Sequence, residues 1–325
     1  MLRNLVEYHW AEYIDDALLL LARLDMKTVP LAGGTHILGL DDESIEAVVD
    51  LRELGLSYIT EDTRGSIHIG AMTTLQNIAD APLCKTFASG LLARTAQASS
   101  SSRLIRNSAT IGGTLGTGAA SQADVLTALS LLEAQVVARS GSKTSVNLSG
   151  GTAERPGLAL SGVVYKGKQE RRIACDDVPG ELRPGELIIE VILPPISALC
   201  STAFARVGRT QTDVALLNGA ALVEVEGDVY QRVRLAFGGV NMEPTRILAV
   251  ERSLEGQHID DNKSILVAIQ TGMGEFRPPT DIRVSGGYRR VSGVKLAQRV
   301  LEEATYLARY HGMQTVQSGK SKESR

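Results

Sequence analysis

The sequence predicts an α+β protein, with two α/β units in the N-terminal part and an antiparallel sheet with helices in the C-terminal part. Before about residue 175, short apolar runs alternate with helical patterns. Two glycine pairs each follow a short apolar stretch. Beyond residue 200, two apolar strands joined through Gly227-Asp228 precede three helical patterns. A chain of 325 residues has room for two or three such units.

The first predicted unit covers residues 1–55. Residues 11–24 carry apolar side chains at helical spacing, with acidic residues near the start of the pattern, which predicts a helix. Residues 28–32 and 47–51 are short apolar runs typical of strands. The first of these strands runs directly into Gly33-Gly34. These features predict a small α/β unit.

The second predicted unit covers residues 56–177. It opens with two short strands, at 58–60 and 66–71, which predict a hairpin around a turn at 62–65. Three helices and then a strand are predicted for residues 74–79, 88–97, 123–134 and 135–139. The serine run at 99–102 indicates a loop, and residues 140–167 are too rich in Gly, Ser and Thr for an assignment.

The third predicted unit covers residues 178–312. It opens with an apolar strand at 186–194, which ends in two prolines. The later predicted strands are 220–226 and 233–237, and the predicted helices are 245–254, 262–273 and 294–308. Residues 313–325 are mostly polar and are predicted to be a disordered tail.

Composition excludes several classes of function. A net charge of −3 with both signs dispersed gives no basis for binding nucleic acid or an anionic membrane. Cys84, Cys175 and Cys200 are too far apart for a zinc site, and three thiols are too few for an iron–sulfur cluster of the chain's own. The histidines have no metal-ligand spacing, so no metal is expected. Without a signal peptide or a run of about 20 apolar residues, a cytoplasmic protein is expected.

The two glycine segments, residues 32–35 and 110–114, are the strongest candidates for a binding site. Glycine adopts positive φ readily and lets ligand atoms approach the backbone. Successive N–H groups in such turns converge on anions, and a helix that follows adds to the attraction. Neither segment is a dinucleotide GxGxxG motif or a Walker A loop. Spacing alone therefore leaves two interpretations open, an anion-binding pair of loops and ordinary tight turns.

Short motifs around these segments follow one another in a fixed order. They are AGGTHIL at 32–38, IGAMTT at 69–74, IRNSATIGGT at 105–114, AASQAD at 119–124, GELIIEVILP at 185–194, RTQTDVA at 209–215, GGV at 238–240 and PTR at 244–246. This ordered set resembles the flavoprotein (medium) subunit of the molybdenum hydroxylases. That family includes xanthine dehydrogenase, carbon monoxide dehydrogenase and 4-hydroxybenzoyl-CoA reductase, and the resemblance spans about residues 1–310.

The resemblance implies a fold and a function. The fold is an FAD-binding domain of the vanillyl-alcohol-oxidase type, split into two α/β subdomains, followed by a smaller C-terminal domain. The function is that of an oxidoreductase subunit which passes electrons from iron–sulfur clusters through FAD to an external acceptor. The implied partners are an iron–sulfur small subunit and a molybdopterin large subunit, in a heterotrimer that can dimerise. The organic substrate would be bound by the large subunit.

The resemblance also implies the flavin-binding residues, and no catalytic residue is expected among them. Backbone amides of the first segment would face the pyrophosphate, and the second segment would form a second clamp. Asp124 would bind ribityl or ribose hydroxyls, Ile188 would contact adenine or flavin through its backbone, and Phe204 would lie near the flavin ring. The complete set is Ala32, Gly33, Gly34, Thr35, His36, Thr110, Gly112, Gly113, Thr114, Asp124, Ile188 and Phe204.

The chain departs from the family pattern at four places. Thr114 replaces the usual Asn, Ser121 or Gln122 replaces the usual Pro, and Arg206 stands where some relatives have Lys. The interval before Asp124 is also one residue longer than usual. Two alternatives remain: a stand-alone FAD-binding protein without molybdenum partners, and a reductase of the UDP-sugar enolpyruvyl type. The reductase would need a substrate acid for which no motif is found.

Overall fold

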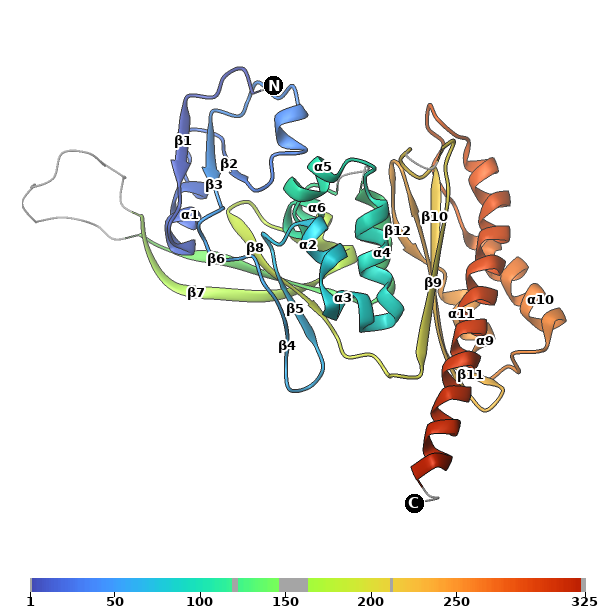
Figure 1. Ribbon diagram of the computed structural model, residues 1–325. Coiled ribbons are helices and arrows are strands. Elements are labelled where there is room, and N and C mark those ends of the chain that lie inside the picture. Colours follow the sequence, from blue (N-terminus) through green and yellow to red (C-terminus); the bar gives the residue numbers. More distant parts are fainter. Residues whose placement is uncertain (1, 119–121, 146–162, 211–212, 323–325) are drawn as a thin grey trace, which may run out of the picture.

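The computed structural model describes residues 2–118, 122–145, 163–210 and 213–322, and in this part of the chain three sheets are present. Figure 1 shows the first sheet at the N-terminal end, the second in the middle, and the third at the C-terminal end beside a long helix. The N-terminal half contains both helices and strands, and the last sheet is antiparallel. The predicted α+β class is confirmed.

The first unit is a parallel three-stranded sheet with one short helix. Its strands have the order β1-β3-β2, and β3 is buried along its whole length because it lies between the other two. Its elements are β1 (Glu7–Trp10), α1 (Ile14–Leu21), β2 (Thr28–Leu31), η1 (Ile37–Gly39) and β3 (Ala47–Asp50). The predicted helix and both predicted strands are present, and the helix is shorter than predicted.

The second unit contains an antiparallel five-stranded sheet of order β4-β5-β8-β6-β7. Its strands are β4 (Ile59–Glu61), β5 (Ile67–Gly70), β6 (Gln135–Ser145), β7 (Val163–Ala174) and β8 (Glu186–Leu193). The predicted hairpin is the β4–β5 pair. Strand β8 lies between β5 and β6, so a domain boundary at 177/178 would divide this sheet. We therefore place the end of the second unit after β8. Residues 146–162 of the unassigned stretch lie outside the described residues.

Short helices accompany this sheet. They are α2 (Leu75–Asp80), α3 (Pro82–Thr86), η2 (Phe87–Gly90), α4 (Leu91–Ala98), α5 (Arg103–Ser108), α6 (Ile111–Thr117), α7 (Ala123–Leu131), η4 (Cys175–Asp177) and α8 (Val178–Glu181). The helix predicted from residue 88 begins three residues later, at Leu91. The φ values of 48°, 53° and 71° at Ala88, Ser89 and Gly90 are incompatible with an α-helix.

The C-terminal unit is an antiparallel sheet of order β12-β11-β10-β9 with helices packed on it. Its elements are β9 (Cys200–Val207), β10 (Leu217–Glu226), β11 (Val229–Gly239), β12 (Met242–Arg246), α9 (Leu248–Leu254), α10 (Asn262–Gly272), η5 (Met273–Glu275) and α11 (Gly286–Lys322). The predicted helix 245–254 is wrong at its start, because Thr245 and Arg246 pair with β11.

The end of the chain also differs from the prediction. Helix α11 runs from Gly286 to Lys322, so the predicted disordered tail is wrong for residues 313–322. The segment contains no proline, and extending an existing helix by one residue adds a hydrogen bond without a new nucleation step. Residues 323–325 lie outside the described part of the chain.

The apolar core consists of three clusters, and two of them join neighbouring units. One combines the α2–α7 helices and the sheet face beneath them with Cys200, Ala220, Leu222 and Ala236 of the C-terminal sheet. Another combines α1 and β3 of the first unit with Val137, Leu187, Ile189 and Ile192 of the five-stranded sheet. Within a strand, successive side chains point to opposite faces. The first unit therefore covers the face of this sheet opposite to the helices.

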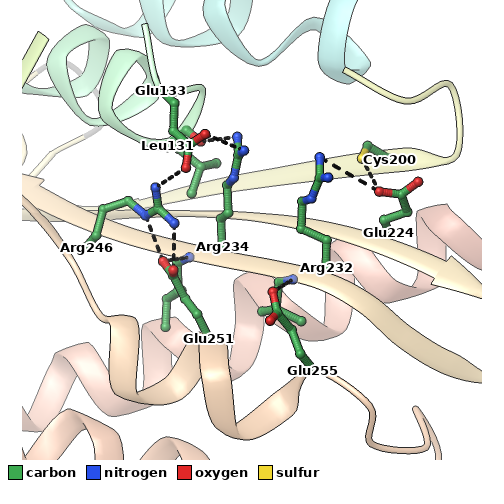
Figure 2. A network of polar contacts seen from close by, with 11 residues as sticks. Leu131, Glu133, Cys200, Glu224, Arg232, Arg234, Arg246, Glu251 and Glu255 are labelled. Atoms are coloured by element: carbon green, nitrogen blue, oxygen red, sulfur yellow. Dashed lines mark hydrogen bonds and ion pairs between the residues drawn. The ribbon is translucent and has the colours of Figure 1, made fainter. Parts of the chain in front are cut away.

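An ionic network joins α7 to the C-terminal unit (Figure 2). Glu133, just after α7, binds Arg234 of β11 and Arg246 of β12 at 2.6 and 2.8 Å. Arg246 also binds the buried carboxylate of Glu251 at 2.6 Å. Both arginines are mostly buried, so these ion pairs fix the junction more firmly than pairs in open solvent would.

No helix in the described part of the chain is long and apolar enough to cross a bilayer. The cytoplasmic location stays a prediction.

Candidate functional site

The first glycine segment is a tight loop between β2 and η1. Gly34 has a φ of 71°, which a residue with a Cβ adopts only with strain. A Cβ on Gly33 would lie 1.6 Å from the carbonyl oxygen of Ser108, at the end of α5. These two glycines therefore let the loop rest directly against the second unit.

The backbone N–H groups of this loop are available to a ligand. Within the described residues, those of Gly33, Gly34, Thr35 and His36 donate no hydrogen bond. Gly33 and Gly34 are partly buried and Thr35 and His36 are exposed, so these four donors are accessible to solvent and to a ligand. All four residues line a cavity of about 290 Å³, here called the first cavity. Such a run of N–H groups is typical of an anion-binding nest.

The second glycine segment is the start of helix α6, and its description as a loop was wrong. Thr110 is the N-cap, and its hydroxyl oxygen accepts a hydrogen bond from Gly113 N at 3.1 Å. Gly112 N donates to Ala71 O and Thr114 N donates to Thr110 O, each at 2.9 Å. These N–H groups are therefore already used within the protein. The predicted second backbone clamp is not supported by them.

The glycines of α6 instead allow close packing. A Cβ on Gly112 would lie 2.7 Å from the Cβ of Ala71, and one on Gly113 would lie 2.9 Å from Thr110 Oγ1 and 3.8 Å from the Cβ of Ala32. Gly112 therefore allows α6 to pack closely against Ala71, just after the end of β5. Gly113 has no side chain that would extend toward the first glycine segment. The two segments do meet, as predicted, and the first cavity lies between them.

Two further cavities continue from the first. The second cavity has a volume of about 500 Å³, and Ala32 and Gly113 line both it and the first cavity. It extends over apolar side chains such as Met72, Leu187 and Ile188. The third, of about 540 Å³, contains Ala32, Gly33, Gly34 and Thr110 and reaches Arg52. Volumes of this size suit small organic ligands. The arrangement fits an extended ligand with an anionic group at the glycines and an apolar group beyond them.

Two predicted flavin contacts lie away from these cavities. Phe204 is on β9 and packs against the apolar core around the helices of the second unit. Asp124 is 3% exposed and lies on α7. Neither side chain lines any of the three cavities described above. Their contacts with a flavin stay predictions, and Ala119, Ala120 and Ser121 of the same motif lie outside the described residues.

Asp124 instead joins the second unit to the C-terminal sheet. Its carboxylate accepts a hydrogen bond from Asn218 Nδ2 at 2.5 Å and lies 3.4 Å from the Arg206 guanidinium. Burial raises the pKa of this carboxyl group, and the charge of Arg206 and the bond from Asn218 oppose that shift. Asn218 also binds Thr127 of α7. The sequence motif predicts a ligand contact for Asp124, and the structure shows an interdomain contact there.

Two polar side chains at the first cavity were not predicted as ligand contacts. Lys27 precedes β2 and lines both the first and the second cavity, and its Nζ is 3.0 Å from Asp42 Oδ2. Gln122 lines the first cavity and is 6% exposed. Neither belongs to a glycine motif, so only the folding of the chain places them there.

The three cysteines contribute no redox chemistry at this site. All are buried and free, and none lines the three cavities. Burial raises the pKa of Cys84 to about 11. Burial, with the nearby charge of Glu224, raises the pKa of Cys200 to about 12. Because the reactive form of cysteine is the thiolate, these thiols are inert at neutral pH.

Two family models match the sequence. Residues 4–196 match the FAD binding domain in molybdopterin dehydrogenase, and residues 202–304 match the CO dehydrogenase flavoprotein C-terminal domain. The chain is 27% identical over 300 residues to the glyceraldehyde dehydrogenase medium chain of Sulfolobus acidocaldarius, covering 91% of this chain and 97% of that one. It is 28% identical over 238 residues to the nicotinate dehydrogenase FAD-subunit of Eubacterium barkeri, covering 71% and 73%.

Solved structures share the fold. A chain of the carbon monoxide dehydrogenase from Hydrogenophaga pseudoflava superposes with a TM-score of 0.77 at 23% identity, covering 95% of this chain and 99% of that one. A chain of quinoline 2-oxidoreductase from Pseudomonas putida 86 gives 0.74 at 23% identity, covering 93% and 97%.

Proposed function

Since the chain belongs to the family of FAD-binding medium subunits of molybdenum hydroxylases, we propose that it accepts electrons from the iron–sulfur clusters of a partner subunit. Through its FAD it passes them to an external acceptor. The family makes the chain an oxidoreductase subunit whose cofactor is FAD. What we propose beyond family membership is that electrons are transferred to this chain, and that they come from iron–sulfur clusters and leave to an external acceptor.

The observation that carries the proposal is the row of unpaired N–H groups at Gly33, Gly34, Thr35 and His36. FAD has an anionic pyrophosphate between two ring systems, and N–H groups on a fixed loop bind such an anion without a basic side chain. The second cavity, with Met72, Leu187 and Ile188 on its wall, offers an apolar surface for a ring. The residues present therefore fit the cofactor.

The role of the protein in such a subunit is to hold and surround the cofactor. Bound FAD supplies the chemistry of exchanging one or two electrons. The residues of this chain contribute binding, orientation and exclusion of water, and none of them has to donate or remove a proton from an organic substrate. Substrate specificity would then belong to a molybdopterin-containing partner.

The relatives support a multi-subunit assembly. One is named a medium chain and another an FAD-subunit, so each of these names describes one component of an enzyme. By this analogy we propose an iron–sulfur small subunit and a molybdopterin large subunit as partners. The alternative is a stand-alone FAD-binding protein of the same fold.

The test is purification of the tagged chain from its native host. We expect flavin absorbance bands, and co-purification of one iron–sulfur and one molybdenum protein. A flavin spectrum without these partners would contradict the proposed electron-transfer role and favour the stand-alone protein. A colourless chain that takes up no added FAD would contradict the binding site itself.

A further inference from the structure

Gln122 occupies an unusual position for a polar side chain. It directly precedes α7, is 6% exposed, and lines the first cavity. A buried amide without partners costs free energy, so its two polar ends need to be accounted for. One end is accounted for by Thr114, whose Oγ1 lies 2.6 Å from Gln122 Oε1. Within the described residues, no hydrogen bond is found for the nitrogen end.

Thr114 holds this amide in a fixed position. It is 1% exposed and belongs to α6, so its side chain is packed in place. Its Oγ1 also lies 2.9 Å from Thr110 O. A hydroxyl group has a single hydrogen, which it donates either to Thr110 O or to Gln122 Oε1.

Each choice presents a different group of Gln122 to the cavity. If Thr114 donates to Gln122 Oε1, the NH₂ group of the amide faces the cavity. If Thr114 donates to Thr110 O, the amide turns over, its nitrogen donates to Thr114 Oγ1, and its oxygen faces the cavity. The first arrangement suits an anion, and the second suits hydroxyl groups.

The rest of the cavity favours the anion. On one side lie the four unpaired N–H groups at residues 33–36. On the other side, the N–H groups of Gly112, Gly113 and Thr114 are already bonded within the protein. An anion held by the first side would therefore receive no backbone donor from these three residues of α6. The NH₂ group of Gln122 can supply a donor on that side.

We propose that Gln122, positioned by Thr114, donates its amide N–H to the pyrophosphate of bound FAD. This rests on the proposed role of the first glycine segment as the pyrophosphate site. The Thr114–Gln122 pair thus replaces the backbone donors that the start of α6 uses internally. It also gives a physical reason for Thr114 and Gln122 at the places where the sequence departs from the family pattern.

The test measures binding of FAD and of ADP, because ADP carries the diphosphate but no flavin and no ribityl chain. Flavin fluorescence reports FAD binding, and competition with FAD reports ADP binding. The main variant is Gln122→Glu, which keeps the shape and turns the donor into a carboxylate. Gln122→Met removes the amide without adding charge. Gln135→Glu, at the exposed first residue of β6, adds the same charge away from the site.

We expect Gln122→Glu to lower the affinity for both FAD and ADP by about ten- to a hundredfold. The variant loses a hydrogen bond to a charged group and adds repulsion between two negative charges. Gln122→Met should weaken both by about three- to tenfold, and Thr114→Val should do so more than Thr114→Ser. Gln135→Glu should leave both affinities unchanged.

Other outcomes overturn the inference in distinguishable ways. If Gln122→Glu and Gln122→Met weaken FAD but not ADP, the amide faces the ribityl hydroxyls and its assignment to the pyrophosphate is wrong. If neither ligand is affected by either folded variant, Gln122 makes no ligand contact. If the wild-type chain binds neither FAD nor ADP, the proposed function fails and the inference fails with it.

Discussion

At the scale of single residues, the absence of a side chain determines how closely the two walls of the cavity approach. Gly33 touches the backbone of Ser108 so closely that no other residue fits, whereas Gly39, the last residue of η1, has no neighbour within 4 Å of its Cβ position. The two positions have the same residue type and different requirements. Only Gly33 is part of the contact between the first and second units.

Replacing Gly33 with alanine should open this contact. The new Cβ would meet a backbone carbonyl that cannot move alone, so the loop must shift away from α5. We expect FAD affinity to fall by at least about tenfold, and stability to fall by about 1–3 kcal/mol. Fluorescence titration with FAD and thermal unfolding measure the two effects. Gly39→Ala is the matched control, and equal affinities for the two variants would contradict the interpretation.

Asp281 gives a prediction about acid sensitivity. Burial raises the pKa of its carboxyl group, but hydrogen bonds from the N–H groups of Arg283 and Val284 and from the Arg289 side chain outweigh burial and lower it to about 2. Because the pKa is lower in the folded state, the carboxylate stabilises the protein above pH about 4. This stabilisation is lost as the pH falls toward 2.

Asp281→Asn should therefore be less stable than the wild type at pH 7, and the difference should shrink when both are compared at pH 3. Arg289 is fully buried, so the loss of its carboxylate partner adds to the effect at neutral pH. Thermal unfolding at the two pH values measures this difference. Exposed Asp15→Asn serves as the control, and a difference independent of pH would contradict the prediction.

At the scale of elements, ionic contacts decide how α9 sits on the C-terminal sheet. Glu251 of α9 is 4% exposed and accepts two hydrogen bonds from Arg246, at 2.8 and 2.6 Å, and one from Leu235 N at 2.9 Å. Arg246 in turn binds Glu133 beyond α7, as Figure 2 shows. One carboxylate thus joins α9 to β11 and β12, and indirectly to the second unit.

Glu251→Gln should destabilise the chain by about 3 kcal/mol, because it leaves a mostly buried arginine with one carboxylate partner fewer. Chemical denaturation measures the change. Glu243→Gln on β12 is the control, since that residue is exposed. We expect FAD affinity per folded molecule to be unchanged, because Glu251 lines none of the three cavities. A loss below about 1 kcal/mol would show that the network contributes little.

Several elements could not be predicted from local sequence. The apolar run of β8 is recognisable as a strand, but its pairing with β5 and β6 is not, because the partner residues lie far away in the sequence, in β5 more than a hundred positions before it. Likewise the second glycine segment lacks the composition of a helix, since glycine costs about 1 kcal/mol there relative to alanine. Its helical form depends on the Thr110 cap and on packing against Ala71.

At the scale of the whole molecule, the cavities lie where the first unit meets the second. The three-stranded sheet alone is small, and its apolar residues are buried against β6 and β8. A ligand held by both units therefore stabilises their contact. When the free ligand concentration is a hundred times the dissociation constant, binding adds about 2.7 kcal/mol to the stability of the folded protein.

Removing FAD should accordingly destabilise the contact between the first and second units, and leave the C-terminal unit unaffected. In hydrogen–deuterium exchange, we expect residues 28–45 and 108–118 to exchange faster without FAD than with it. Exchange in α9 and α10 should be the same in both states, because neither helix lines the first, second or third cavity. Protection confined to the C-terminal unit would contradict the placement of the ligand.

The sequence by itself determined the α+β class, most strands and the flavoprotein family, and it indicated the first glycine segment as the candidate site. These follow from hydrophobic periodicity, glycine and ordered motifs, which are local properties of the chain. Only the tertiary structure decided that β8 closes the second unit, that Asp124 binds Asn218 and Arg206, and that Lys27 and Gln122 reach the first cavity. The physical reason is that burial and hydrogen-bond partners are set by residues distant in sequence. The same acidic side chain therefore binds a ligand or joins two domains according to what packs against it.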